Sequence, residues 1–133
     1  MADPSPADRI LAKGPRATVE FAVRRNGQME AKEWLDSQPE RTLASFGVFF
    51  ERLVQVGRIR NETQFRNLQD DVWEFKRKIH RLLCVRIGNR YMLTHRIKKA
   101  GGSGKCPAAE IAHAESIGQE HIAWEMQSRK GNQ

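Results

Sequence analysis

The sequence has only two cysteines, and neither belongs to a pattern that forms a disulfide framework or a metal site. Cys84 lies within the apolar run LLCV, which is typical of a small buried hydrophobic residue. Cys106 precedes a proline at the start of a predicted helix, and the chain contains no CxxC or HExxH motif. The four histidines have no spacing typical of metal ligands. We therefore expect a protein that needs no metal and no other cofactor.

Long hydrophobic runs are also missing from the 133-residue chain. No segment approaches the roughly 18 consecutive apolar residues of a membrane-spanning helix. The first 16 residues, MADPSPADRILAKGPR, contain three prolines and no continuous apolar stretch, so we interpret them as a flexible arm rather than a secretory signal. We expect a cytoplasmic protein that does not contact a membrane. The length predicts one domain over residues 17–128, followed by a short tail over residues 129–133.

Acidic residues are scarce in the middle of the chain. Residues 58–105 contain 13 lysines and arginines against four acidic residues, whereas the other residues together carry more acids than bases. One concentrated basic region indicates a binder of a polyanion. The alternative is the solvated surface of a generally basic protein, which agrees less well with the acidic remainder.

The apolar pattern predicts seven elements. We expect a strand over residues 17–24, helices over 29–37 and from about 38 to 56, a loop over 58–71, and strands over 72–79, 81–87 and 90–98. The second helix should begin with a capping box, in which Ser37 is the cap and Glu40 follows three residues later, and it should end at Gly57. The last helix extends from 107 to about 127, after a flexible glycine-rich link at 101–105 that lacks the features of a phosphate-binding loop. The order β-α-α-β-β-β-α indicates an α+β fold, in which a small antiparallel sheet has its helices packed mainly on one face.

The strand over residues 90–98 combines an apolar face with many cations. Tyr91, Leu93 and Ile97 are every second residue, so we expect them to share one buried face. Alternation on neighbouring strands should then place the cations side by side on the other face, where like charges repel. Because fold stability alone does not favour this arrangement, we expect an anionic partner.

Four stretches in the second half of the chain resemble a known protein family. They are WEFK (73–76), HRLL (80–83), LTHRIKK (93–99) and CPAAEI (106–111). In this order they are similar to the RelE/HigB superfamily of bacterial and phage toxins, and most similar to its HigB-like, phage-derived branch. Lys76 stands where the family usually has arginine, and His80 stands where it usually has tyrosine.

This resemblance implies both a fold and an activity. The family has a small antiparallel sheet with two N-terminal helices and one C-terminal helix. Its ribonuclease members enter the A site of the small ribosomal subunit and cut mRNA there without a metal. A neighbouring gene encodes the antitoxin that inhibits each toxin, and we expect a helix-turn-helix antitoxin as the partner of this chain.

Metal-free RNA cleavage requires a base for the attacking 2′-OH, cations for the phosphorane and an acid for the leaving oxygen. With the resemblance, these needs give a set of candidate residues. The candidate catalytic residues are Arg81, His95, Lys98, Lys99 and Glu74, and the candidate RNA-binding residues are Lys76, Lys78, Arg86, Arg90 and Arg96.

The roles within this set stay open. Arg81 suits the phosphorane because a guanidinium grips two oxygens, but it could instead form a structural ion pair with Glu74. His95 could be the acid or the base, and Glu74 could be the base or could orient a cation. We expect replacement of Arg81 or His95 to abolish cutting while leaving the fold intact.

We therefore predict the toxin of a type II toxin–antitoxin pair, acting as a ribosome-dependent, metal-independent mRNA endonuclease. One alternative is a toxin of the same fold that inhibits DNA gyrase, although that branch usually lacks the basic catalytic set. Another is a phage or prophage protein that binds RNA or a protein partner without cutting.

Overall fold

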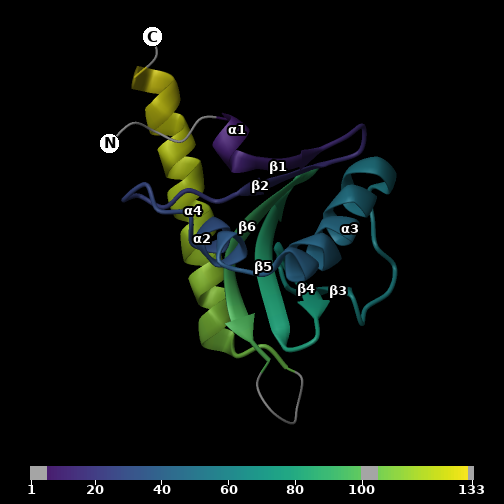
Figure 1. The fold of residues 1–133 in the computed structure, drawn as a ribbon. Helices are drawn as coiled ribbons and strands as arrows, with labels where there is room; N and C mark the ends of the chain where they lie inside the picture. Colours follow the sequence, from purple (N-terminus) through teal and green to yellow (C-terminus); the bar gives the residue numbers. More distant parts are fainter. Residues whose placement is uncertain (1–5, 100–104, 132–133) are drawn as a thin grey trace.

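The fold is a mixed α+β arrangement, and the computed structural model describes residues 6–99 and 105–131. A six-stranded sheet forms its centre, with three longer helices and one short helix in the described part (Figure 1). In chain order the elements are α1 (Pro6–Arg9), β1 (Ile10–Lys13), β2 (Thr18–Phe21), α2 (Glu30–Asp36), α3 (Glu40–Val56), β3 (Phe65–Gln69), β4 (Val72–Arg77), β5 (His80–Ile87), β6 (Arg90–Lys98) and α4 (Ala108–Gly131).

The strand order in the sheet is β1-β2-β6-β5-β4-β3. All neighbours are antiparallel except β2 and β6, which run parallel from Thr18 beside Arg90 to Phe21 beside Leu93. The prediction of a purely antiparallel sheet is therefore wrong. The chain leaves β2, passes through both helices and the meander, and returns alongside β2 in the same direction.

Helices cover both faces of the sheet, so the prediction that they pack mainly on one face is also wrong. On one face, α2 and α3 cover a core cluster that includes Phe46, Phe75 and Leu82. On the other face, α4 covers a second cluster that includes Leu83 and Ile117 (Figure 1). We call these the α3 face and the α4 face. Because strand residues alternate between them, adjacent residues in the sequence face different helices.

A bulge at Thr94 reverses this alternation within β6. Leu83 and Cys84 are adjacent on β5, but their partners on β6 are His95 and Leu93, so Thr94 is an extra residue between the two pairs. The hydroxyl of Thr94 donates a hydrogen bond to the carbonyl oxygen of Leu83 at 3.2 Å.

The bulge moves the end of β6 onto the opposite face. Tyr91 and Leu93 lie in the cluster under α3, whereas Ile97 lies in the cluster under α4. The prediction that these three residues share one face is therefore wrong for Ile97. The same reversal places His95 on the α4 face and Arg96 on the α3 face, opposite Leu82.

Two further strands lie at the edges of the sheet. Residues 65–69 form β3 within the predicted loop, and Phe65, which is 3% exposed, packs on Trp73 with ring centroids 4.9 Å apart. Residues 10–13 form β1 within the predicted arm and pair with β2. Residues 1–5 and the GGSG segment at 101–104 lie outside the described residues. At the other end, α4 extends to Gly131, into the predicted tail.

No helix in the described ranges, 6–99 and 105–131, is long and apolar enough to cross a membrane.

Only the C-terminal end of α3 agrees with the sequence pattern. The predicted capping box fails because Pro39 precedes the helix without a side-chain cap, and the Ser37 hydroxyl instead donates to the Trp34 carbonyl oxygen at 2.6 Å. Gly57 ends the helix as predicted, in a left-handed conformation with φ of 91°.

Replacing Gly57 by alanine is expected to lower the free energy of unfolding by about 1 kcal/mol, because side chains are strained at this φ. The matched control is Gly47→Ala inside the same helix, where an added methyl group meets no atom within 4 Å. That change should stabilise the protein by roughly 0.5–1 kcal/mol. Urea denaturation of both variants measures the difference, and a similar change in the two would contradict the role of Gly57.

Candidate nucleic-acid interface

The strand register gathers cations at one end of the sheet. The β4–β5 turn follows Arg77, which pairs with His80, and His80 in turn pairs with Lys98 at the end of β6. Lys76 pairs with Arg81 in the next position and therefore leaves the sheet on the α4 face, although its side chain also lines the cleft described below. We call this end, formed by the β4–β5 turn and the last residues of β6, the hairpin end.

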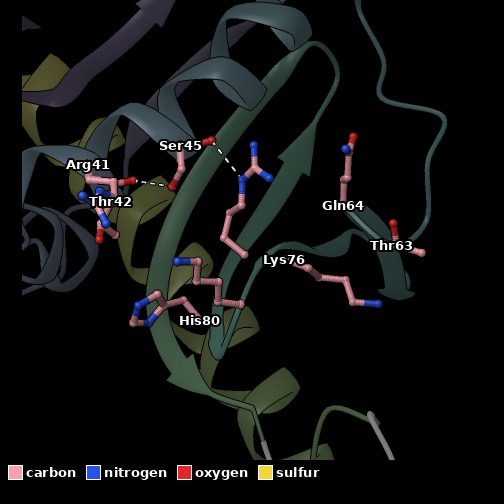
Figure 2. A pocket seen from close by; sticks show the side chains of 9 residues that line it. Arg41, Thr42, Ser45, Thr63, Gln64, Lys76 and His80 are labelled. Carbon is pink, nitrogen blue, oxygen red and sulfur yellow. Dashed lines mark hydrogen bonds between the residues drawn. The ribbon is translucent and has the colours of Figure 1, made fainter.

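A cleft of about 360 Å³ lies at the hairpin end. Figure 2 shows side chains from α3, from the segment before β3 and from the β4–β5 hairpin around it. Four lining residues are cationic, one is histidine, and none of those described is acidic. The lining residues are Arg41, Thr42, Ser45, Thr63, Gln64, Lys76, Arg77, Lys78 and His80.

Local contacts hold two of the four cations of the cleft. Arg77 lies with its guanidinium carbon 4.4 Å from the centre of the Phe49 ring, and its Nε donates to the Ser45 carbonyl oxygen at 3.3 Å (Figure 2). The ammonium of Lys76 donates to the Glu62 carbonyl oxygen at 3.3 Å. Lys78 occupies the turn with a left-handed φ of 52° and an exposed side chain. The protein itself therefore positions Arg77 and Lys76, whereas the Lys78 side chain is exposed.

Burial lowers the pKa of Lys76 from its usual value. The neighbouring charge of Arg66 lowers it further, as do Arg81 and Lys99, whereas Glu74 raises it. Lys76 therefore loses its proton more easily than an isolated lysine, since burial and like charges both disfavour the ammonium form.

His80 is held on three sides at the edge of the cleft. A terminal guanidinium nitrogen of Arg96 lies 2.9 Å from His80 Nδ1. The ring packs against Trp34 at 4.9 Å and against Phe46 at 6.5 Å between centroids. Burial lowers the pKa of His80, and the charges of Arg96 and Lys78 lower it further.

Sequence reasoning missed His80, Arg41 and Arg77 as residues of this site. The sequence did contain a signal for His80. It directly precedes a predicted strand and replaces the tyrosine that is usual there in the family that the sequence resembles. Arg77 lies between Lys76 and Lys78, within a run of three cations. Arg41 is separated from that run by more than 30 residues, and only the packing of α3 on the sheet brings it near.

Arg81 and Glu74 form an ion pair on the α4 face, with 3.4 Å between Arg81 Nε and Glu74 Oε1. They are 8% and 1% exposed, respectively. One terminal nitrogen of Arg81 also donates to the carbonyl oxygens of Lys78 and His80, each at 2.9 Å. The geometry agrees with the structural alternative for Arg81, since two of its three guanidinium nitrogens contact protein groups.

Burial raises the pKa of the Glu74 carboxyl, although the charges of Arg66, Lys76 and Arg81 lower it in part. Its second oxygen accepts no hydrogen bond from any described residue and lies 3.8 Å from a guanidinium nitrogen of Arg66. The ionised form is therefore incompletely compensated in the fold.

His95 lies under α4, on the opposite face of the sheet from the cleft. It is 6% exposed, its Nδ1 is 3.2 Å from the Thr94 hydroxyl, and its Nε2 is 3.5 Å from Glu110 Oε1. The His113 ring packs against it at 4.6 Å. Burial lowers the pKa of His95, and the charge of His113 lowers it further. The predicted pairing of His95 with the lysines in one open pocket is therefore wrong.

Comparison with protein families gives a match over most of the chain. Residues 33–117, more than half of the chain, match the model of the phage-derived Gp49-like proteins (DUF891). The chain belongs to the Gp49-like family. The matched range includes every residue that lines the cleft. No curated protein matches the sequence.

In this Gp49-like protein the two predicted catalytic lysines, Lys98 and Lys99, lie on different faces at the end of β6. Both are exposed, but Lys98 pairs with His80 on the α3 face, whereas alternation directs Lys99 to the α4 face. The backbone N–H of Lys99 donates to the Ile79 carbonyl oxygen at 2.7 Å. Lys98 therefore lies beside the cleft, and Lys99 lies behind it.

Two of the predicted RNA-binding residues lie at the other end of the sheet, beside the β5–β6 turn. Arg86 is exposed, donates to the Gly88 carbonyl oxygen at 3.0 Å and lies over the Tyr91 ring. Arg90 forms ion pairs with Glu20 and Glu125. The prediction that they share a surface with the hairpin end is therefore wrong.

The acidic cluster around Arg90 also has the composition of a metal site. Single ligand atoms of Glu20, His121 and Glu125 lie within 4.8 Å of one another. Arg90 pairs with both carboxylates, and His121 Nδ1 accepts the backbone N–H of Val23 at 2.9 Å. The two carboxylates that a metal would need are thus paired with Arg90, and the cluster connects α4 to β2 and β6.

Proposed function

We propose that this Gp49-like protein is the toxin of a type II toxin–antitoxin pair and cuts mRNA on the ribosome without a metal. The observation that supports this proposal most strongly is the cationic cleft at the hairpin end, which has no acidic residue among its described lining. Such a surface binds phosphates, and the hydroxyl and amide groups that also line the cleft can bind a base or a ribose. The family membership is consistent with a toxin-related protein.

In the proposed reaction, the 2′-oxygen of the RNA attacks the adjacent phosphorus and the bond to the 5′-oxygen breaks. The products are a cyclic phosphate and a free 5′-OH. Lys76 is the candidate acceptor of the 2′-OH proton because burial lowers its pKa. Arg41 and Lys78 are the candidate phosphate ligands, and the Lys78 ammonium can protonate the leaving oxygen.

The proposed protein partner is a helix-turn-helix antitoxin, which acts in the cytoplasm with the toxin. An acidic segment of such a partner would fit the cleft and compete with RNA for the same cations.

A second candidate function is binding of RNA without cutting. The burial of Arg81 and His95 favours it, because the two residues that best suit the chemistry in sequence are the ones engaged inside the protein. Expression in bacteria and mapping of mRNA 5′ ends separates the two functions. New 5′ ends within codons support cutting, and intact mRNA supports binding alone.

Removing one cation from the cleft is expected to weaken RNA binding. Arg41→Ala should lower the affinity for a single-stranded RNA by about fivefold. It should also reduce the slope of log affinity against log salt concentration by about one, because one fewer counterion is released. Fluorescence anisotropy at several salt concentrations measures both quantities. Arg52→Ala is the matched control, because Arg52 is also exposed on α3 but does not line the cleft. Equal losses in the two variants would place RNA elsewhere.

A further inference from the structure

We propose that His80 is a catalytic residue that donates a hydrogen bond from neutral imidazole to the phosphate, and that Arg96 is the positioning residue that fixes this state. The inference rests on the proposed function, since it assumes RNA in the cleft. It assigns a role to a side chain that general reasoning about histidine would treat as an acid or a base.

The contact with Arg96 determines which ring nitrogen bears the proton. A guanidinium has five donors and no acceptor, so a hydrogen bond between it and Nδ1 requires a lone pair on that nitrogen. In the neutral ring the hydrogen then resides on Nε2, the nitrogen not bonded to Arg96. Protonation of Nδ1 would direct two N–H groups at each other.

Packing fixes the plane of the ring as well. Trp34 from α2 lies 4.9 Å from the His80 ring, and the guanidinium of Arg96 lies 5.3 Å from the Trp34 ring. Arginine, tryptophan and histidine thus form a closed set of three mutual contacts on the α3 face. A ring held in this way presents Nε2 in one direction, as preorganised donors in active sites do.

The surrounding charges keep the ring neutral. Arg77 and Lys98 are the register partners of His80 on β4 and β6, Lys78 occupies the turn, and Arg41 lines the cleft from α3. With Arg96 these groups are all cationic, and the pKa of His80 is lowered by burial and by Arg96 and Lys78. An additional positive charge on the ring is therefore disfavoured.

These constraints leave one chemical role. Nε2 bears the hydrogen and Nδ1 is bonded to Arg96, so the ring has no free lone pair to accept the 2′-OH proton. A neutral imidazole is also too weak an acid to protonate the leaving oxygen. It can donate a hydrogen bond to a non-bridging phosphate oxygen, which gains charge as the 2′-O–P bond forms and the P–O5′ bond breaks. His80 keeps its proton throughout the step.

The test compares His80→Ala with His80→Gln. The glutamine amide can donate a hydrogen bond but cannot exchange a proton near neutral pH. We expect His80→Ala to slow single-turnover cutting of ribosome-bound mRNA by about 100-fold, and His80→Gln to remain within about tenfold of the wild type. Equal losses in both variants would show acid–base catalysis and overturn the proposal.

Arg96→Met supplies a second readout. Without the guanidinium, His80 can protonate at moderate pH, so the cutting rate should acquire a step near pH 6–7 that the wild type lacks. Long-range ¹H–¹⁵N spectra of the free protein report the tautomer independently of activity. A hydrogen on Nδ1, or an imidazolium at neutral pH, would overturn the proposal in the wild type.

Failure of the proposed function has a different signature. If the wild type cuts no mRNA, the same variants are compared in RNA binding by fluorescence anisotropy. Weaker binding by His80→Ala with near wild-type binding by His80→Gln would support the donor role in a binding protein. Unchanged affinity in His80→Ala would overturn it.

Discussion

Replacing Arg90 by alanine is expected to lower the free energy of unfolding by about 3–4 kcal/mol. Its guanidinium connects β6, on which Arg90 lies, to β2 and α4. Nε lies 3.4 Å from a Glu20 oxygen on β2, and a terminal nitrogen lies 3.2 Å from a Glu125 oxygen on α4. Breaking a buried ion pair costs roughly 3–5 kcal/mol because the remaining charge is left without compensation. The partly exposed Arg90 and Glu125 side chains argue for the lower part of that range.

Glu20 is the residue most affected by this change. It is 4% exposed, and burial alone would raise the pKa of its carboxyl. Hydrogen bonds from His121 and Arg90, together with the positive charge of Arg90, outweigh burial and lower that pKa below its usual value. Alanine at position 90 would leave two carboxylates beside His121, with His121 Nε2 3.1 Å from each.

The effect of Arg90 should depend on pH. Because the pKa of Glu20 is lower in the folded state, its ionised form contributes stability above the unfolded pKa, near 4.5. That contribution is lost as the pH falls through the lower folded value. The difference between wild type and Arg90→Ala should therefore be largest at neutral pH and shrink below about pH 4.

Urea denaturation at neutral and acidic pH measures both effects. Arg86→Ala is the matched control, because Arg86 is exposed on the same hairpin, where it donates to the Gly88 carbonyl oxygen and lies over the Tyr91 ring, and it forms no ion pair with a described residue. It should change the free energy of unfolding by less than about 0.5 kcal/mol. A cost for Arg90→Ala no greater than this would show that the cluster does not fasten α4.

The local sequence pattern predicts the elements that carry their own signals. The meander, α3 and its glycine cap, and α4 follow from alternation, helical periodicity and turn residues. The pattern does not predict β3, because its residues, FRNLQ, are mostly polar and lie at a sheet edge, where only Phe65 must be buried. The pattern does not predict β1 either, because prolines lie on both sides of it in the sequence. The parallel pairing of β2 with β6 depends on the path of the whole chain and has no local signature.

The candidate site was predictable as a location but not as a set of residues. The charge pattern indicates the hairpin end, where Lys76 pairs with Arg81 and Lys98 pairs with His80. It cannot separate His80 from Arg81, which are neighbours in the sequence but face different helices. The bulge at Thr94 then determines the face of His95, and the hydrophobic pattern alone does not place it.

Arg81 is expected to affect the cleft indirectly, by stabilising the turn beside it. Its guanidinium donates to the carbonyl oxygens of Lys78 and His80, and so holds the turn that carries both residues into the cleft. Arg81→Ala should lower the free energy of unfolding by about 3 kcal/mol, since it removes charged hydrogen bonds and leaves Glu74 buried without this partner. RNA binding should weaken as well, because Lys78 needs support in its left-handed conformation.

Glu74→Gln is the informative counterpart of this variant. Burial raises the pKa of Glu74, so its contribution to stability is present below the unfolded pKa, near 4.5, and is lost as the pH rises through the folded value. Glutamine resembles the neutral form, and the substitution should therefore change the free energy of unfolding at neutral pH by less than about 1 kcal/mol.

Combining the two changes tests the structural role directly. The double variant should recover part of the stability lost in Arg81→Ala, because no buried carboxylate then remains without its arginine. Urea denaturation of the four proteins gives the coupling free energy, which we expect to exceed about 1 kcal/mol. Suppose instead that Arg81→Ala is as stable as the wild type, binds RNA equally well and no longer cuts. Arg81 would then contact the reacting phosphate, and the chemistry would belong on the α4 face rather than in the cleft beside His80.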